Sequence, residues 1–185
     1  MSTVLEVTMK SQWGPGKGGF VDLNCGWYCE VAALTYWAER RLGKKMPDNP
    51  RDLLPYSKCK HGFKPDSEDD RRLVVATRQK PQTALEWERF LLSNGVGIVG
   101  GKLGGADWGR FFKGGIGHMV VIVGVDTQTN ELLYKDPLQG NSLKRGAFSH
   151  VNPRIDSVYY VNVLKLTLDL NELVAPVIPG RRRIA

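Results

Sequence analysis

The chain has 185 residues, of which 42% are hydrophobic and 24% charged, and its formal net charge is +7 at pH 7. A chain of this length buries one sizeable core, so we expect a single domain over residues 1–185. No uninterrupted apolar run approaches the roughly 20 residues of a membrane-spanning helix, which excludes that class of protein. The basic residues are dispersed rather than gathered in a nucleic-acid-binding module, so we expect no nucleic-acid and no membrane partner.

Two further features bear on where the protein works. Residues 1–10 lack the basic stretch followed by an apolar stretch that marks a secretory signal peptide. The three cysteines are an odd number, which argues against a disulfide framework and for a reducing compartment in which a free thiol persists. We therefore expect a protein that is made in the cytoplasm and needs a dedicated machine if it is exported.

The N-terminal half predicts a strand, a loop and one long helix. Residues 1–23 form an arm, with a short strand over residues 4–9 and then a glycine-rich loop. Asn24 is a good N-cap for a helix that runs to about residue 42, and Gly43 ends it. Apolar side chains recur at helical spacing and predict a buried stripe on this helix, formed by Trp27, Val31, Leu34, Ala38 and Leu42.

The second half predicts one more helix, followed by strands. Thr83 and Glu86 form a capping box for a helix that ends at Asn94-Gly95. Apolar runs bounded by turn residues predict strands over residues 96–99, 117–125, 131–135 and 158–166. The remaining segments are an irregular excursion over 44–80 with a short helix near 69–77, a glycine-studded loop over 100–117, and a tail over 168–185. Helices first and an antiparallel sheet afterwards indicate an α+β fold.

Three residues carry the chemistry that the sequence suggests. Cys25 lies in the first turn of the predicted long helix, His118 opens an apolar strand and Asp136 closes the next strand. A thiol needs a base to become a thiolate, and that base needs an acceptor that fixes its tautomer. A nucleophile, a base and an orienting group in this chain order favour a cysteine hydrolase of papain type.

Cys29 is a rival nucleophile, because the Cys-Gly-x-Cys arrangement of papain, in which the second cysteine reacts, resembles the segment from Cys25 to Cys29. The positive end of the helix dipole lowers the pKa of a thiol most strongly in the first turn. Since Cys25 is closer to the start of the helix, we favour it over Cys29.

A zinc site is the chemical alternative to a catalytic thiol. Cys25 and Cys29 share one helix face, and Cys59 and His61 offer two further ligands. The Cys-x₃-Cys spacing on a helix fits poorly with structural zinc sites and leaves the candidate base and orienting group unexplained. We therefore predict no metal and no cofactor.

The motifs around these residues resemble a known group of enzymes. Asn24-Cys25-Gly26-Trp27-Tyr28-Cys29 is similar to the Asp-Cys-Gly-x-Ala-Cys helix of bacteriocin-processing double-glycine peptidases. Gly117-His118-Met119-Val120 and Tyr134-Lys135-Asp136-Pro137 resemble their His strand and Asp-Pro turn. The chain is also similar to papain-like effector proteases of bacterial plant pathogens. The resemblance covers about residues 20–42 and 83–140, and it implies a papain-like fold in which an N-terminal catalytic helix packs on an antiparallel sheet.

Carried over residue by residue, the resemblance makes Cys25 the nucleophile, His118 the general base and acid, and Asp136 the orienting group. It implies a cysteine endopeptidase that forms a thioester and cleaves a target protein after small residues such as Gly-Gly. The same thioester chemistry on a side-chain amide would make the protein a glutamine deamidase or transglutaminase toxin. A third interpretation is a binding module that keeps the papain-like fold without turnover.

The resemblance also implies an oxyanion hole and a narrow cleft. The oxyanion would be held by the backbone N–H of the nucleophile and by a glutamine side chain about six residues before it. Gly19 stands at that position here, so Gln12 and Asn24 remain as alternatives for the amide. Aromatic side chains are candidates for the cleft wall, namely Trp27, Trp108 and Phe111.

The biological role is inferred from the same likeness. We expect a bacterial effector or toxin that a specialised secretion system delivers into the cytoplasm of a target cell. The producing cell would hold the enzyme inactive with an immunity protein. The positive net charge of the chain would suit an acidic inhibitor.

Overall fold

The computed structural model describes residues 2–11, 25–46, 74–103 and 117–164, together with residues 166, 167 and 170. In this part of the chain the strands are β1 (Ser2–Val4), β2 (Val74–Ala76), β3 (Gly97–Gly101), β4 (His118–Asp126), β5 (Glu131–Lys135), β6 (Leu143–Ala147) and β7 (Ile155–Val161). The helices are α1 (Cys25–Thr35), α3 (Ala84–Asn94) and α4 (Phe148–Val151), with a π-helical segment η1 (Tyr36–Arg41) and a 3₁₀ turn η3 (Asn152–Arg154). No helix in these ranges is long and apolar enough to cross a bilayer.

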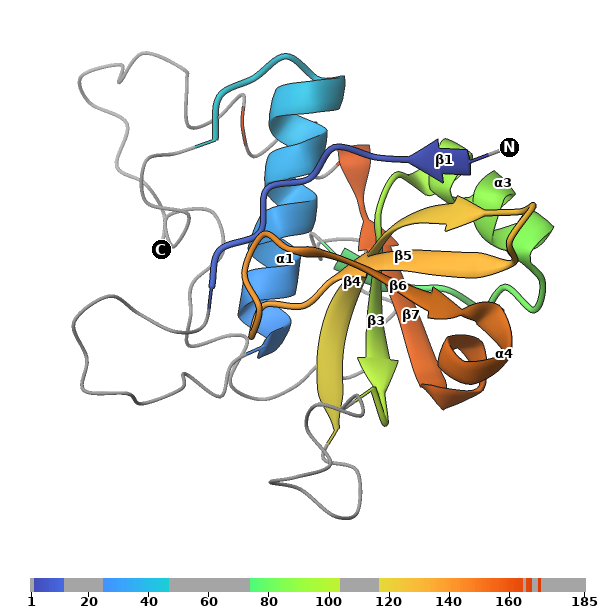
Figure 1. The fold of residues 1–185 in the computed structure, drawn as a ribbon. Coiled ribbons are helices and arrows are strands. Elements are labelled where there is room, and N and C mark those ends of the chain that lie inside the picture. Colours follow the sequence, from blue (N-terminus) through green and yellow to red (C-terminus); the bar gives the residue numbers. More distant parts are fainter. Residues whose placement is uncertain are drawn as a thin grey trace, which may run out of the picture.

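The strands form one antiparallel sheet in the order β2-β7-β3-β4-β5-β6. β4 is the long central strand, visible in Figure 1 between β3 and β5. The first half of β4 pairs with β3, and β1 pairs with its last residues. The fold is therefore α+β, as the sequence predicts.

The sheet separates two apolar cores. Val121 of β4 belongs to the core that also contains α1. Val120 and Ile122 belong to the second core, with Trp87 and Leu91 of α3. Successive side chains of a strand point to opposite faces, so α1 and α3 cover opposite faces of the sheet. Figure 1 shows the two helices well apart.

Helix α1 is buried on more than one side. The predicted stripe is confirmed, because Trp27, Val31, Leu34 and Ala38 are buried and Leu42 is partly buried. Other residues of α1 are buried as well, among them Gly26, Cys29, Glu30, Ala32 and Ala33. One reason lies in the N-terminal segment, which crosses α1 in Figure 1 and adds Val7 and Met9 to the same core.

Three predicted elements differ from the structure. The first strand covers Ser2–Val4 rather than 4–9, because the chain leaves the sheet after Leu5. The short helix predicted near 69–77 is wrong where the structure describes it, since Val74–Ala76 pairs with β7 as a strand. β7 itself covers Ile155–Val161 rather than 158–166.

Both ends of α3 are fixed as the sequence predicts. The Thr83 hydroxyl accepts a hydrogen bond from the Glu86 backbone N–H at 3.1 Å. Gly95 follows the helix with φ +69°, a conformation that favours glycine. Its missing side chain also admits the Trp37 ring, whose Nε1–H donates to the Asn94 carbonyl at 3.1 Å. This contact ties the end of α3 to η1.

Candidate active site

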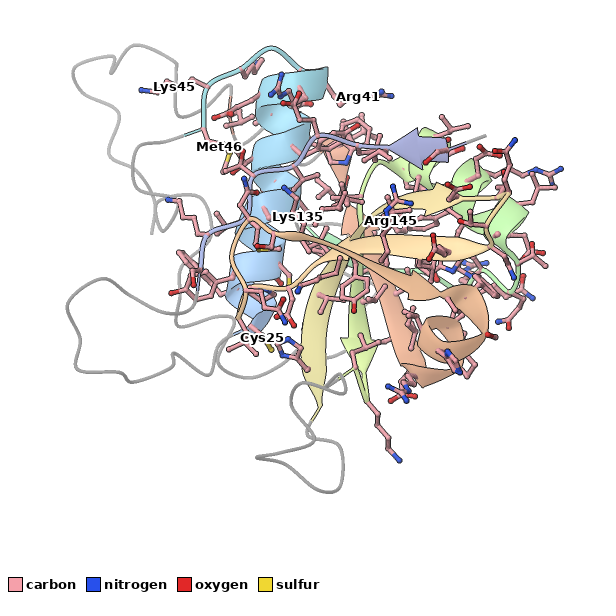
Figure 2. All side chains as sticks on the ribbon, viewed as in Figure 1. Cys25, Arg41, Lys45, Met46, Lys135 and Arg145 are labelled. Carbon is pink, nitrogen blue, oxygen red and sulfur yellow. The ribbon has the colours of Figure 1, made fainter. Side chains whose placement is uncertain are left out.

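The candidate residues meet where the start of α1 lies against the start of β4. Cys25 is the first residue of α1 and His118 the first of β4, and the two elements pack together. Asp136 follows β5 directly, and the antiparallel pairing of β5 with β4 returns the chain toward the start of β4. In Figure 2, Cys25 lies at one end of the helix formed by α1 and η1, and Arg41 lies at the opposite end.

The imidazole of His118 is held by a buried carboxylate. His118 Nε2 lies 2.8 Å from Asp136 Oδ1, and the two side chains are only 10% and 7% exposed. The same Oδ1 accepts the Leu138 backbone N–H at 2.9 Å, and the Asp136 carbonyl accepts the Gln139 N–H at 2.8 Å. The turn therefore fixes the carboxylate, and the carboxylate fixes the ring.

His118 is also hydrogen-bonded to the sulfur of Cys25. Because Nε2 faces Asp136, the second ring nitrogen, Nδ1, is left for the sulfur. Burial alone raises the pKa of the Cys25 thiol, but several groups reverse the effect and lower that pKa below its usual 9.0. These are the hydrogen bond and charge of His118, and the backbone N–H groups of Met119 and Gly26.

The pKa of His118 moves in the opposite direction. Burial lowers it, but the hydrogen bonds and charges of Asp136 and Cys25 outweigh burial and raise the pKa from 6.5 to about 9. A lowered thiol pKa beside a raised imidazole pKa shifts the pair toward a thiolate and an imidazolium. The arrangement can therefore supply both a nucleophile and a proton donor.

The surroundings of Cys29 are different. Its side chain is completely buried in the core beside α1. Burial raises the pKa of this thiol well above 9.0, and the charges of Cys25, Asp136 and Glu30 raise it further. Cys25, by contrast, is partly exposed. These surroundings favour Cys25 as the reactive thiol and Cys29 as a small apolar core residue.

The other predicted site residues are only partly covered. Trp27 is buried, with its ring edge-on to Tyr28 at 5.2 Å between centroids, and its role in a cleft wall stays a prediction. The remaining oxyanion and cleft candidates lie outside the described residues, and they are Gln12, Asn24, Trp108 and Phe111. The backbone N–H groups of the first turn of α1 have no acceptor within the helix, so the N–H of Cys25 stays a candidate oxyanion donor.

The zinc alternative is tested only where the structure describes its ligands. Among the described residues, no three His, Cys, Asp or Glu side chains gather as a metal site would require. Two of the four ligands considered, Cys59 and His61, lie outside that part of the chain.

Sequence reasoning missed the backbone donors of the site. The Met119 N–H stabilises the Cys25 thiolate, and no sequence pattern indicates this contact. The Leu138 N–H donates to Asp136, and here a signal exists. An Asp side chain often accepts from its own backbone two residues on, so Asp136-Pro137-Leu138 is a recognisable turn of this kind.

Comparisons with protein-family models and with curated proteins give no significant match. The function is therefore inferred from the geometry of Cys25, His118 and Asp136 and from the motifs around them.

Proposed function

We propose that the protein is a papain-type cysteine endopeptidase with Cys25 as nucleophile, His118 as general base and acid, and Asp136 as orienting residue. One observation carries the proposal: a buried imidazole bonded on one side to a carboxylate and on the other to a thiol. Burying such a polar chain costs desolvation energy, and apolar side chains often stabilise a core equally well. A buried chain of this kind is therefore better explained by catalysis than by stability.

The reaction would proceed in two halves. The Cys25 thiolate attacks the scissile carbonyl carbon, and the carbonyl oxygen becomes an oxyanion beside the N–H groups that start α1. As the C–N bond breaks, the His118 imidazolium gives its proton to the leaving amine, and a thioester remains on Cys25. In the second half His118 takes a proton from water, hydroxide attacks the thioester, and the C–S bond breaks to restore the thiolate.

Asp136 supports both halves of the reaction. By accepting from Nε2–H it keeps Nδ1 toward the sulfur, so that the proton is exchanged on the reacting side of the ring. Its negative charge also stabilises the imidazolium of the resting enzyme. The carboxylate therefore acts on both the orientation and the pKa of the base.

The fold and the biological role form the second layer of the proposal. A papain-like fold is supported by a nucleophile at the start of a helix and by a base and an orienting group on the antiparallel sheet behind it. The double-glycine peptidase resemblance supports cleavage after small residues in a target protein. It also supports a bacterial effector or toxin, exported by a specialised system and restrained by an immunity protein in the producing cell.

The test is a comparison of new peptide N-termini in a bacterial lysate treated with wild type, Cys25→Ala or Cys29→Ala. Cys29→Ala is the matched control, because it removes a sulfur from the same helix one turn away. We expect new termini after small residues with wild type and Cys29→Ala, and none with Cys25→Ala. One-dalton shifts at glutamines without new termini would replace the peptidase by a deamidase. If the wild type produces neither new termini nor one-dalton shifts, the result would indicate a binding module.

A further inference from the structure

The turn that carries Asp136 is hydrogen-bonded to the N-terminal segment through the residues on either side of it. Lys135 Nζ donates to the Val7 carbonyl oxygen at 2.5 Å and to Asn141 Oδ1 at 2.6 Å. Asn141 Oδ1 also accepts the Met9 backbone N–H at 3.1 Å. Figure 2 labels Lys135 near the N-terminal segment to which it donates. One amide oxygen thus joins the two ends of the turn to a segment far away in the sequence.

The turn is also closed from within. The Leu138 and Gln139 N–H groups donate to Asp136, as described above. Gly140 has φ +62°, and a Cβ atom added to it would lie 3.4 Å from the Cβ of Ser11. The backbone of the turn therefore runs directly against the N-terminal segment, next to the Asn141 contact.

The N-terminal segment is firm enough to serve as an anchor. β1 pairs with β4, and the Leu5 N–H donates to the Val123 carbonyl at 2.7 Å. Val7 and Met9 are each 3% exposed in the core beside α1. Glu6 is exposed by contrast, and its charge partly offsets the effect of burial, which lowers the pKa of Lys135. The anchor is thus backbone pairing and apolar burial rather than charge.

We propose that Asn141 is a positioning residue, which holds Lys135 and the N-terminal segment together by hydrogen bonds so that the Asp136 carboxylate stays directed at His118. This inference rests on the proposed function, because it assigns Asn141 to the same triad. Asn141 acts through Asp136 and takes no part in the bond-breaking steps. A displacement of the turn by a fraction of an ångström would weaken the 2.8 Å bond between Asp136 and the ring.

Asn141 is well suited to a direct test. The residue is exposed, so replacing it leaves both apolar cores intact and the variant should fold. Asn141→Leu has a similar size and no acceptor, whereas Asn141→Asp keeps an acceptor for both donors. Ser142→Ala is the matched control, since Ser142 is the exposed neighbour in the chain.

The experiment measures how the rate of Cys25 alkylation by iodoacetamide depends on pH in the full chain. Mass spectrometry of the modified peptide separates Cys25 from the other cysteines, and no peptide substrate is needed. We expect Asn141→Leu to raise the midpoint by about one pH unit, which is about tenfold less thiolate at lower pH. Asn141→Asp and Ser142→Ala should keep the wild-type midpoint.

The outcomes distinguish this inference from the proposed function. If the Cys25 alkylation midpoint of the wild type is lowered but Asn141→Leu leaves it unchanged, the positioning role alone is overturned. The same holds if Ser142→Ala shifts the midpoint as much as Asn141→Leu does. An ordinary thiol midpoint in the wild type would overturn the ion pair and both proposals with it. A shift in Asn141→Leu alone would support the positioning role even if the lysate experiment found deamidation instead of cleavage.

Discussion

Strand β4 carries a polar network at each end, and the two networks differ in exposure. At the first residue of the strand, His118 bonds to Asp136 in a buried setting. At the last residue, Asp126 lies 3.9 Å from the guanidinium of Arg145, whose side chain is 52% exposed. Asp126 is itself only 14% exposed, so water screens the second network mainly through Arg145 and through Glu131, which is 30% exposed. Both networks shift a pKa, since the Thr129 and Gln128 N–H groups lower that of Asp126, but only the buried network contains the candidate thiol and imidazole.

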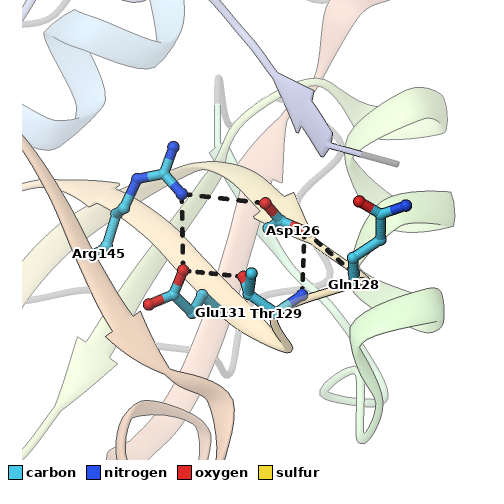
Figure 3. A network of polar contacts seen from close by, with 5 residues as sticks. All are labelled: Asp126, Gln128, Thr129, Glu131 and Arg145. Atoms are coloured by element: carbon cyan, nitrogen blue, oxygen red, sulfur yellow. Dashed lines mark hydrogen bonds and ion pairs between the residues drawn. The ribbon is translucent and has the colours of Figure 1, made fainter.

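The exposed network holds the turn between β4 and β5 (Figure 3). Asp126 Oδ1 accepts the backbone N–H groups of Gln128 and Thr129 at 3.0 and 3.2 Å. Glu131 accepts the Thr129 hydroxyl at 2.8 Å and lies 3.5 Å from Arg145. Apart from Arg145, these residues are close neighbours in the chain. The network therefore shapes a turn locally, whereas the buried network joins α1, β4 and the turn after β5.

The largest expected effect comes from removing the base at the buried end. His118→Ala should lower kcat/KM by about 10³-fold or more, because the thiolate loses its partner and the leaving amine its proton donor. Cleavage of a substrate identified in the lysate experiment measures this loss. His150→Ala is the control, since His150 is exposed on α4, and it should retain wild-type activity. Substantial turnover by His118→Ala would exclude His118 as the base.

A smaller effect is expected when the carboxylate loses only its charge. Asp136→Asn keeps an oxygen that accepts from His118 and Leu138, but the imidazolium loses its counter-charge. The wild-type ring holds its proton until the pH rises through about 9, so activity should fall there. In Asp136→Asn the alkaline limb of the pH–kcat profile should move toward pH 6.5, with about tenfold less activity at pH 8. An unmoved limb would contradict the role of this charge.

The smallest effect is expected at the exposed end. Glu131→Gln should change the free energy of unfolding by less than about 1 kcal/mol, because exposed ion pairs contribute little. Urea denaturation measures this change, and the alkylation midpoint of Cys25 should equal that of wild type. A larger loss of stability, or a shift of that midpoint, would show that the two ends of β4 do not differ as the structure indicates.

Local signals were enough to predict much of the fold. The capping box at Thr83 fixed the start of α3, and the turn before β5 fixed the Glu131–Lys135 strand to the residue. The N-terminal strand was misplaced for a physical reason. Val7 and Met9 alternate with polar residues like a strand, but they are buried against α1 after the chain has left the sheet. Alternation of apolar and polar residues indicates that one face of a segment is buried, but it does not show whether that segment pairs in a sheet or packs against a helix.

The sequence by itself determined the three candidate catalytic residues, their chain order and the elements that carry them. Tertiary structure decided which thiol is the better candidate nucleophile, because Cys25 and Cys29 lie on one helix and differ in burial and in their contact with His118. It also decided that Asn141, an ordinary surface residue in the sequence, bridges the N-terminal segment and the Asp136 turn. The physical reason is the same in both cases. Caps and turns depend on neighbours in the chain, whereas burial, pKa and positioning depend on groups that only the folded protein brings together.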